Sequence, residues 1–92
     1  MRKDLSKAKY IDFVHKLTGH SKIFIEKNLK IQERPLAKTF VFTAGTLSYY
    51  TWIDHGRIYT QCFLENECQC AWYHNFDTFE YDWKFTQEVQ YE

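Results

Sequence analysis

Four residues with the chemistry of metal ligands stand close together in the chain: Cys62, Cys68, Cys70 and His74. Thiolates and imidazole bind zinc, and four such ligands complete a closed structural site. In an extended strand, however, Cys68 and Cys70 lie roughly 6 to 7 Å apart, which is too far for tetrahedral ligands unless the strand bulges. Their spacing also matches none of the common paired-cysteine zinc patterns. We therefore expect no metal site and no cofactor.

The same cysteines have two other interpretations. Free cysteine behaves as a small buried hydrophobic residue, so all three can belong to the core. Cys62 and Cys70 are also expected opposite each other on neighbouring strands, which leaves a redox-sensitive disulfide between them as the alternative. Three cysteines crowded into nine positions are a poor framework for a secreted domain, so we expect reduced thiols.

Catalysis has no recognisable constellation in this sequence. A cysteine or serine nucleophile needs a histidine base within hydrogen-bond reach. We expect His15 in a helix, His20 at its end, His55 in a turn and His74 at the end of a strand, where they form no such pair. Three scattered glycines also exclude a Gly-rich phosphate loop. The sequence therefore predicts a non-enzymatic protein without catalytic residues.

Charge is separated along the chain although its sum is zero. Residues 1–38 contain ten Lys or Arg and four Asp or Glu, a net +6, whereas residues 39–92 contain two and eight, a net −6. The basic N-terminal third, residues 1–38, can contact phosphates; alternatively, its charges form a solvated helix face without a binding role. In either case the separation affects how a partner approaches.

Composition is that of one small globular domain spanning residues 1–92. The chain has 92 residues, of which 45% are hydrophobic and 26% charged, far from the composition of a disordered segment. No apolar run is long enough to span a membrane, and the N-terminus lacks the apolar region of a signal peptide. We expect a cytoplasmic protein. The unusual value is 20% aromatic residues, which supply much burial in a small core.

The first elements follow from local signals. Asp4 or Ser6 can cap a helix that ends at Gly19, since apolar residues recur at helical spacing between them. Residues 22–32 fit a hairpin turning at Lys27 and Asn28, with a short helix as the alternative. Pro35 interrupts regular structure before a strand over 38–43.

The remainder predicts an antiparallel meander with strands over 47–53, 58–64, 68–74 and 79–86. A turn over 54–57 with Gly56 pairs Tyr49 with Cys62. A loop over 65–67 pairs Leu64 with Cys68 and Cys62 with Cys70. A loop over 75–78 pairs Cys70 with Trp83. The expected fold is α+β, with an N-terminal helix packed on one face of a four- to six-stranded antiparallel meander sheet.

Because side chains alternate along a strand, this register assigns every strand residue to a face. The face expected under the helix carries Leu47, Tyr49, Ile53, Ile58, Cys62, Leu64, Cys68, Cys70, Trp72, Phe79, Tyr81, Trp83 and Phe85. The other face carries Ser48, Tyr50, Trp52, Tyr59, Gln61, Phe63, Gln69, Ala71, Tyr73, Glu80, Asp82 and Lys84. A solvated face is normally polar, so the rings on this second face need a cover or a partner.

We therefore predict a protein-binding surface formed by aromatic residues with an acidic border: Tyr50, Trp52, Tyr59, Phe63, Tyr73, Glu80 and Asp82. Small aromatic-rich domains without catalytic motifs suit an inhibitor, and a phage or mobile-element inhibitor of a host defence protein is one hypothesis of this type. A homodimer interface is compatible with the same surface. The rival function is binding of single-stranded nucleic acid through exposed rings and the basic N-terminal third. Glu80 and Asp82 argue against that rival because they would repel phosphate.

Overall fold

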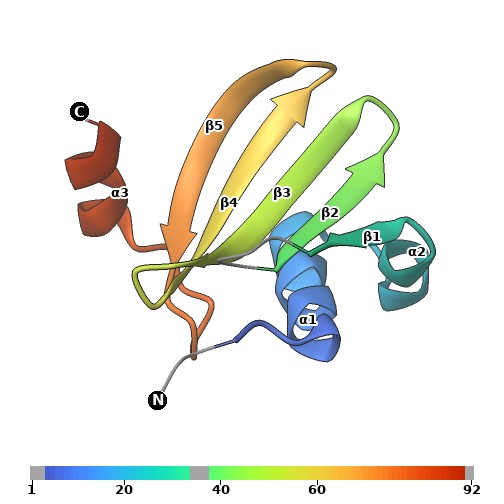
Figure 1. Cartoon of the computed structure of the whole chain (residues 1–92), viewed down its shortest axis with the longest axis horizontal. Helices are drawn as coiled ribbons and strands as arrows, with labels where there is room; N and C mark the ends of the chain where they lie inside the picture. The colour runs from blue at the N-terminus through green and yellow to red at the C-terminus, as the bar shows by residue number, and fades with distance from the viewer. Residues whose placement is uncertain (1–3, 34–37, 91–92) are drawn as a thin grey trace.

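The computed structural model describes residues 4–33 and 38–90, and the side chains of 87–90 are not described. In chain order the elements are α1 (Lys7–Thr18), α2 (Lys22–Lys27), β1 (Leu29–Gln32), β2 (Thr39–Ala44), β3 (Leu47–Asp54), β4 (Arg57–Leu64), β5 (Glu67–His74) and α3 (Trp83–Gln90) (Figure 1). The strands form a five-stranded antiparallel sheet in the order β1-β2-β3-β4-β5. The predicted α+β meander with a packed N-terminal helix is confirmed.

Helix α1 begins and ends at the predicted signals. The Ser6 hydroxyl accepts a hydrogen bond from the N–H of Lys9 at 3.1 Å, which satisfies one of the free donors of the first turn. At the other end Gly19 adopts a φ of 83°, and its N–H donates to the carbonyl of His15. This left-handed conformation ends the helix at low cost because glycine has no Cβ.

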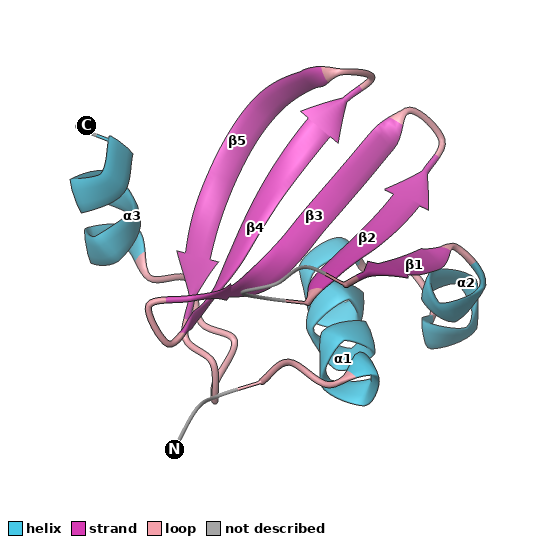
Figure 2. Cartoon of the chain, in the orientation of Figure 1, coloured by secondary structure: helices cyan, strands magenta, loops and turns pink. Residues whose placement is uncertain are grey.

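The main core lies between the sheet and the two N-terminal helices. Tyr10 of α1 stacks on Phe40 of β2 with ring centroids 4.8 Å apart, and Ile25 of α2 is fully buried in the same cluster. By strand register Phe40 shares a face with Thr51, which lies two residues along β3 from both Tyr49 and Ile53 and so on the face expected under the helix. Both helices therefore cover the face that was expected to be covered. Figure 2 shows α3 well apart from α1 and α2, beyond β5.

The predicted hairpin over 22–32 is wrong in its first half, which is helix α2. The Ser21 hydroxyl accepts from the N–H of Phe24 at 3.2 Å and caps this helix. The alternation of apolar residues does not reveal such a cap, which favours the alternative of a short helix. The second half is β1, which pairs with β2 so that Ile31 faces Phe40. The proposed break at Pro35 lies outside the described residues.

The predicted strand over 79–86 is also wrong. An isolated bridge between His74 and Tyr81 is what remains of the pairing, and the chain then enters α3. The Asp82 carboxylate accepts from the N–H of Phe85 at 3.0 Å and caps α3. Consequently Phe79, Tyr81, Trp83 and Phe85 do not form the row beside Trp72 that their alternation predicted.

Register in the central hairpin agrees with the prediction. Leu47 faces Leu64 and Tyr49 faces Cys62 across β3 and β4. The connecting turn has positive φ at both His55 (54°) and Gly56 (70°), the geometry that matches the twist of a two-residue hairpin.

Between β4 and β5 the register departs from the prediction at the turn and then recovers. Leu64 pairs with Glu67, and Phe63 with Cys68, because the connection is shorter than the predicted loop. A register shift between Cys62 and Phe63 absorbs one residue, so that Cys62 faces Cys70 as predicted. Register therefore assigns Cys68 to the face of Phe63, not to the face of Leu64.

Candidate binding surface

Five aromatic side chains share the sheet face opposite α1, as their alternation predicted. We call the set Tyr50, Trp52, Tyr59, Phe63 and Tyr73 the aromatic face. Trp52 on β3, Tyr59 on β4 and Tyr73 on β5 stand on one rung of the sheet. The positions follow from strand alternation in the β3–β4 hairpin and in the part of the β4–β5 pairing beyond its register shift, so the backbone fixes which rings are neighbours.

The rings of the aromatic face touch one another. Trp52 and Tyr59 have centroids 4.9 Å apart, and Tyr59 and Tyr73 have centroids 4.6 Å apart. A separate pair, Tyr50 and Phe63, packs edge to face at 5.3 Å. These distances are those of favourable aromatic pairs. These contacts fix the positions of the rings relative to one another.

Exposure differs along the aromatic face. Tyr50, Trp52, Tyr59 and Phe63 are each half-buried, whereas Tyr73 is 3% exposed. The difference arises because Phe85 of α3 packs perpendicular to the Tyr73 ring with centroids 4.4 Å apart. Helix α3 thus covers the β5 end and leaves the four other rings uncovered by any described helix.

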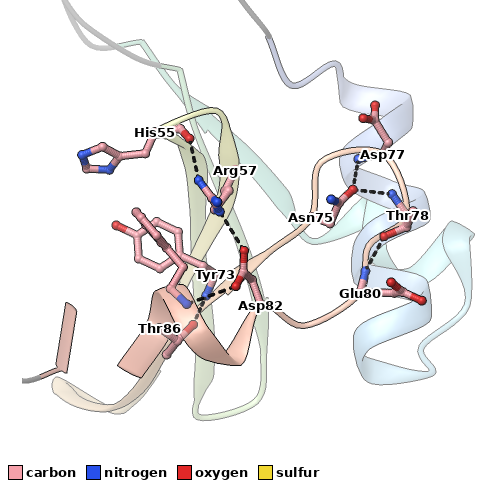
Figure 3. A network of polar contacts seen from close by, with 10 residues as sticks. His55, Arg57, Tyr73, Asn75, Asp77, Thr78, Glu80, Asp82 and Thr86 are labelled. Carbon is pink, nitrogen blue, oxygen red and sulfur yellow. Dashed lines mark hydrogen bonds and ion pairs between the residues drawn. The ribbon is translucent and has the colours of Figure 1, made fainter. Parts of the chain in front are cut away.

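Polar contacts fix α3 against the sheet (Figure 3). The Arg57 Nε donates to the Asp82 carboxylate at 2.8 Å, and the Arg57 guanidinium lies over the Phe85 ring, 4.1 Å from its centroid. The backbone of Tyr73 is bonded twice, its N–H donating to the Thr86 hydroxyl and its carbonyl accepting from the N–H of Asp82. Together these contacts join the first turn of α3 to the edge of β5.

Electrostatics follow from the same contacts. The Arg57 guanidinium, and then the N–H of Phe85, lower the pKa of the Asp82 carboxyl. Burial, followed by a hydrogen bond donated to Asp54, raises the pKa of the Tyr73 hydroxyl. At neutral pH Tyr73 therefore stays a neutral donor, and Asp82 stays ionised and paired.

The predicted acidic border is not assembled, because it depended on the strand over 79–86. Asp82 is neutralised by Arg57 and capped into α3. Glu80 is exposed in the segment between β5 and α3, where its N–H donates to the Thr78 hydroxyl (Figure 3). Asp82 therefore lies beside Tyr73 with its charge paired, and Glu80 does not accompany it along a strand.

The lysines of α1 and α2 lie on the opposite side of the sheet from the aromatic face, whereas Lys30 of β1 shares the face of Tyr50 by strand register. Lys7 pairs with Glu26 at 3.4 Å and Lys22 with Asp12 at 2.9 Å, while the Lys9 ammonium lies 4.4 Å from the centroid of the Phe76 ring. These cations belong to α1 and α2, which cover the other face.

The cysteines and histidines do not converge. Cys62 is buried, Cys70 half-buried and Cys68 exposed, and all three are free. Burial, then the neighbouring Cys62, raises the pKa of the Cys70 thiol. Within residues 4–33 and 38–90 no group of three or more His, Cys, Asp or Glu side chains is placed to hold a metal ion.

The other histidines serve local structure. His15 Nδ1 lies 2.7 Å from the His20 carbonyl oxygen at the end of α1. His55 is in the β3–β4 turn beside Asp54. Sequence reasoning missed Arg57, Phe85 and Thr86, which hold α3 against the sheet. The available signal was Asp82, a helix-capping residue type three positions before Phe85.

No helix among the described residues is long and apolar enough to cross a membrane. Comparisons of the chain with protein-family models, with curated proteins and with solved structures found no match.

Proposed function

We propose that this domain is a non-enzymatic binding protein that recognises another protein through the aromatic face. The observation that carries the proposal is the row of contacting rings on strands β3 and β4, half-buried and uncovered by any described helix. Tyrosine and tryptophan dominate interface hot spots because they offer large contact areas and polar edges. Rings already held by their neighbours also lose little rotamer freedom on binding.

Charge placement favours a protein over single-stranded nucleic acid. A nucleic-acid site combines stacking rings with Lys and Arg along the same groove. Here the lysines of α1 and α2 lie across the sheet from the aromatic face, and two of them, Lys7 and Lys22, are paired with carboxylates. On the strands of the aromatic face, Arg57 is paired with Asp82, and Lys30 of β1 stands on the rung of Tyr50 by register, so few described cations accompany the rings.

Ring geometry supports the same choice. A nucleobase stacks on an open ring face, whereas Trp52 and Tyr59 meet at an interplanar angle of 65° and Tyr50 and Phe63 at 72°. In each pair the edge of one ring is directed at the face of the other, so open faces are fewer than the count of rings suggests. A protein partner needs only a complementary apolar surface.

Such a domain acts by occupying its partner's surface, which is the action of an inhibitor. The hypothesis that the partner is a host defence protein and the source a phage or mobile element remains a prediction from protein type. Self-association is the simplest competing use of the face, because a second copy would cover the same rings.

The test is affinity capture followed by measured affinities for wild type, Trp52→Ala and Trp83→Ala. Trp83 is the matched control because it is 52% exposed but lies on α3 outside the aromatic face. We expect Trp52→Ala to weaken partner binding about thirtyfold, which is about 2 kcal/mol, and Trp83→Ala to leave it within a few fold.

Two parallel measurements separate the rivals. Light scattering of the purified domain detects a homodimer, which Trp52→Ala should dissociate if the face is used for self-association. Fluorescence anisotropy with a labelled oligothymidine detects nucleic-acid binding. Tight, salt-sensitive oligonucleotide binding that survives Trp52→Ala would contradict the proposal.

A further inference from the structure

A pocket on the helix-covered side of the sheet combines polar side chains with apolar ones. Its wall is formed by Phe13, Lys16 and Leu17 of α1, by His74 at the end of β5, and by Phe79 and Tyr81 of the following segment. The pocket volume is about 200 Å³. An enclosed apolar cavity of about 150 Å³ binds benzene, so the volume of this partly open pocket matches the size of one small ring.

His74 is the unusual member of this wall. His74 is only 6% exposed, and its Nδ1 is buried with no hydrogen-bond partner in the described structure. Burial also lowers the pKa of His74, which keeps the imidazole neutral. A buried N–H without an acceptor is costly, so the proton is expected on Nε2, which then remains a donor for a bound molecule.

Lys16 supplies positive charge at the same pocket. Its ammonium lies 3.5 Å from the carbonyl oxygen of Thr78, and within the described chain no carboxylate comes within ion-pair distance of it. Lys7 and Lys22 of the neighbouring surface do have such carboxylates. The pocket therefore combines an uncompensated cation with a neutral imidazole donor.

The apolar part of the pocket is built from rings held in fixed positions. Phe13 contacts His74 and Phe79 edge to face, at 5.0 and 5.5 Å between centroids. Tyr81 contacts His74 at 5.7 Å. The segment carrying Phe79 is closed by backbone hydrogen bonds from Asn75 to Glu80 and from Phe79 to Asn75, so the aromatic wall is preformed.

We propose that this pocket binds a small aromatic carboxylate, with its ring between Phe13, Phe79 and Tyr81 and its carboxylate accepting from Lys16 and His74. An anion is favoured because Lys16 is a cation, and the His74 Nε2 N–H and the Tyr81 hydroxyl can donate to the same carboxylate. A cation is disfavoured by Lys16. The site is on the opposite side of the sheet from the aromatic face, so the inference does not rest on the proposed function.

The test uses NMR titrations of the whole chain with sodium benzoate, benzyl alcohol and benzylammonium chloride. Benzoate should give saturable shifts of the His74 and Tyr81 ring signals with a dissociation constant on the order of 1 mM. Benzyl alcohol and benzylammonium should bind about tenfold more weakly or not at all, because neither matches the charge of Lys16.

Variants connect the signal to the pocket. Lys16→Gln should weaken benzoate about five- to tenfold, whereas Lys27→Gln, an exposed lysine of α2, should leave affinity within about twofold. His74→Phe keeps a ring in the wall, and Tyr81→Ala changes a residue that is 49% exposed; either should reduce binding while the chain stays folded by circular dichroism.

Three results would each overturn the proposal. The first is the absence of saturable shifts at His74 at benzoate concentrations on the order of 50 mM, far above the expected dissociation constant. The second is equal binding of benzoate and benzylammonium. The third is equal weakening by Lys16→Gln and Lys27→Gln, which would indicate nonspecific attraction of an anion.

Discussion

The attachment of α3 to the sheet depends on one carboxylate, so substitution of Asp82 gives the sharpest test of the structure. One oxygen caps the helix through the N–H of Phe85 at 3.0 Å, and the other accepts from Arg57 at 2.8 Å. A lost cap costs about 1 kcal/mol, and an ion pair of this exposure about 0.2 to 1 kcal/mol. We therefore expect Asp82→Ala to lower the free energy of unfolding by about 1 to 2 kcal/mol.

Asp82→Asn separates the two contributions. Asparagine caps a helix as well as aspartate does, so this variant keeps the cap and loses the charge opposite Arg57. Its cost should be about 0.5 kcal/mol. Glu80→Ala is the matched control, because Glu80 is exposed and bonds to Thr78 through its backbone N–H; its cost should stay within about 0.5 kcal/mol.

Urea and thermal unfolding measure these differences, since about 1 kcal/mol shifts the melting temperature by roughly 4 to 8 °C in a domain of this size. The pH dependence has a defined sign. Arg57 lowers the folded-state pKa of Asp82, so the stabilisation is complete above the unfolded-state pKa of about 3.9 and is lost as pH falls through the lower folded value. Wild type and Asp82→Asn should therefore converge in acid. Equal costs for Asp82→Ala and Asp82→Asn would refute the capping role.

Further predictions concern the cysteines, treatment with a chelator and the lysines of α1. Cys62→Ser should cost about 1 to 3 kcal/mol because it buries a hydroxyl, whereas Cys68→Ser should cost less than about 0.5 kcal/mol; a bulky thiol reagent should modify Cys68 first, and simultaneous labelling of Cys62 in the native protein would contradict the register. The domain should stay folded in chelator, and stoichiometric zinc whose removal unfolds it would reverse our interpretation. Lys7→Glu should change partner affinity only a few fold, since remote charges act mainly on association rate, whereas loss of binding by this variant together with normal binding by Trp52→Ala would favour nucleic acid.

The parts of the fold that sequence predicted are those with strong local signals. Ser6 and Gly19 delimit α1, and the turn at Gly56 sets the register of β3 and β4. Because that register is fixed by a two-residue turn, the rings of Tyr50 and Trp52 were assigned to the correct face. The Cys62–Cys70 pairing was also predicted correctly, but only because two errors cancelled: the predicted loop was one residue too long, and the register shift between Cys62 and Phe63 was not foreseen.

The failures have a common physical origin. Residues 79–86 alternate in hydrophobicity as a strand does, yet Asp82 caps a helix and the Phe85 ring packs against the Tyr73 ring. Alternation over so few residues does not distinguish a strand from a short helix packed by one or two contacts. The acidic border failed with this strand. The His74 pocket needed three separate segments to meet, which no spacing along the chain displays.

The two bonds to the backbone of Tyr73 also determine how the sheet ends. β5 is an edge strand, and an edge offers free N–H and C=O groups to any other strand that approaches. At Tyr73 both groups are already bonded, to the Thr86 hydroxyl and the Asp82 N–H. A chain without α3 would therefore present a longer, unblocked edge beside an aromatic surface. We expect such a chain to aggregate by pairing of its β5 edge with other chains before it unfolds.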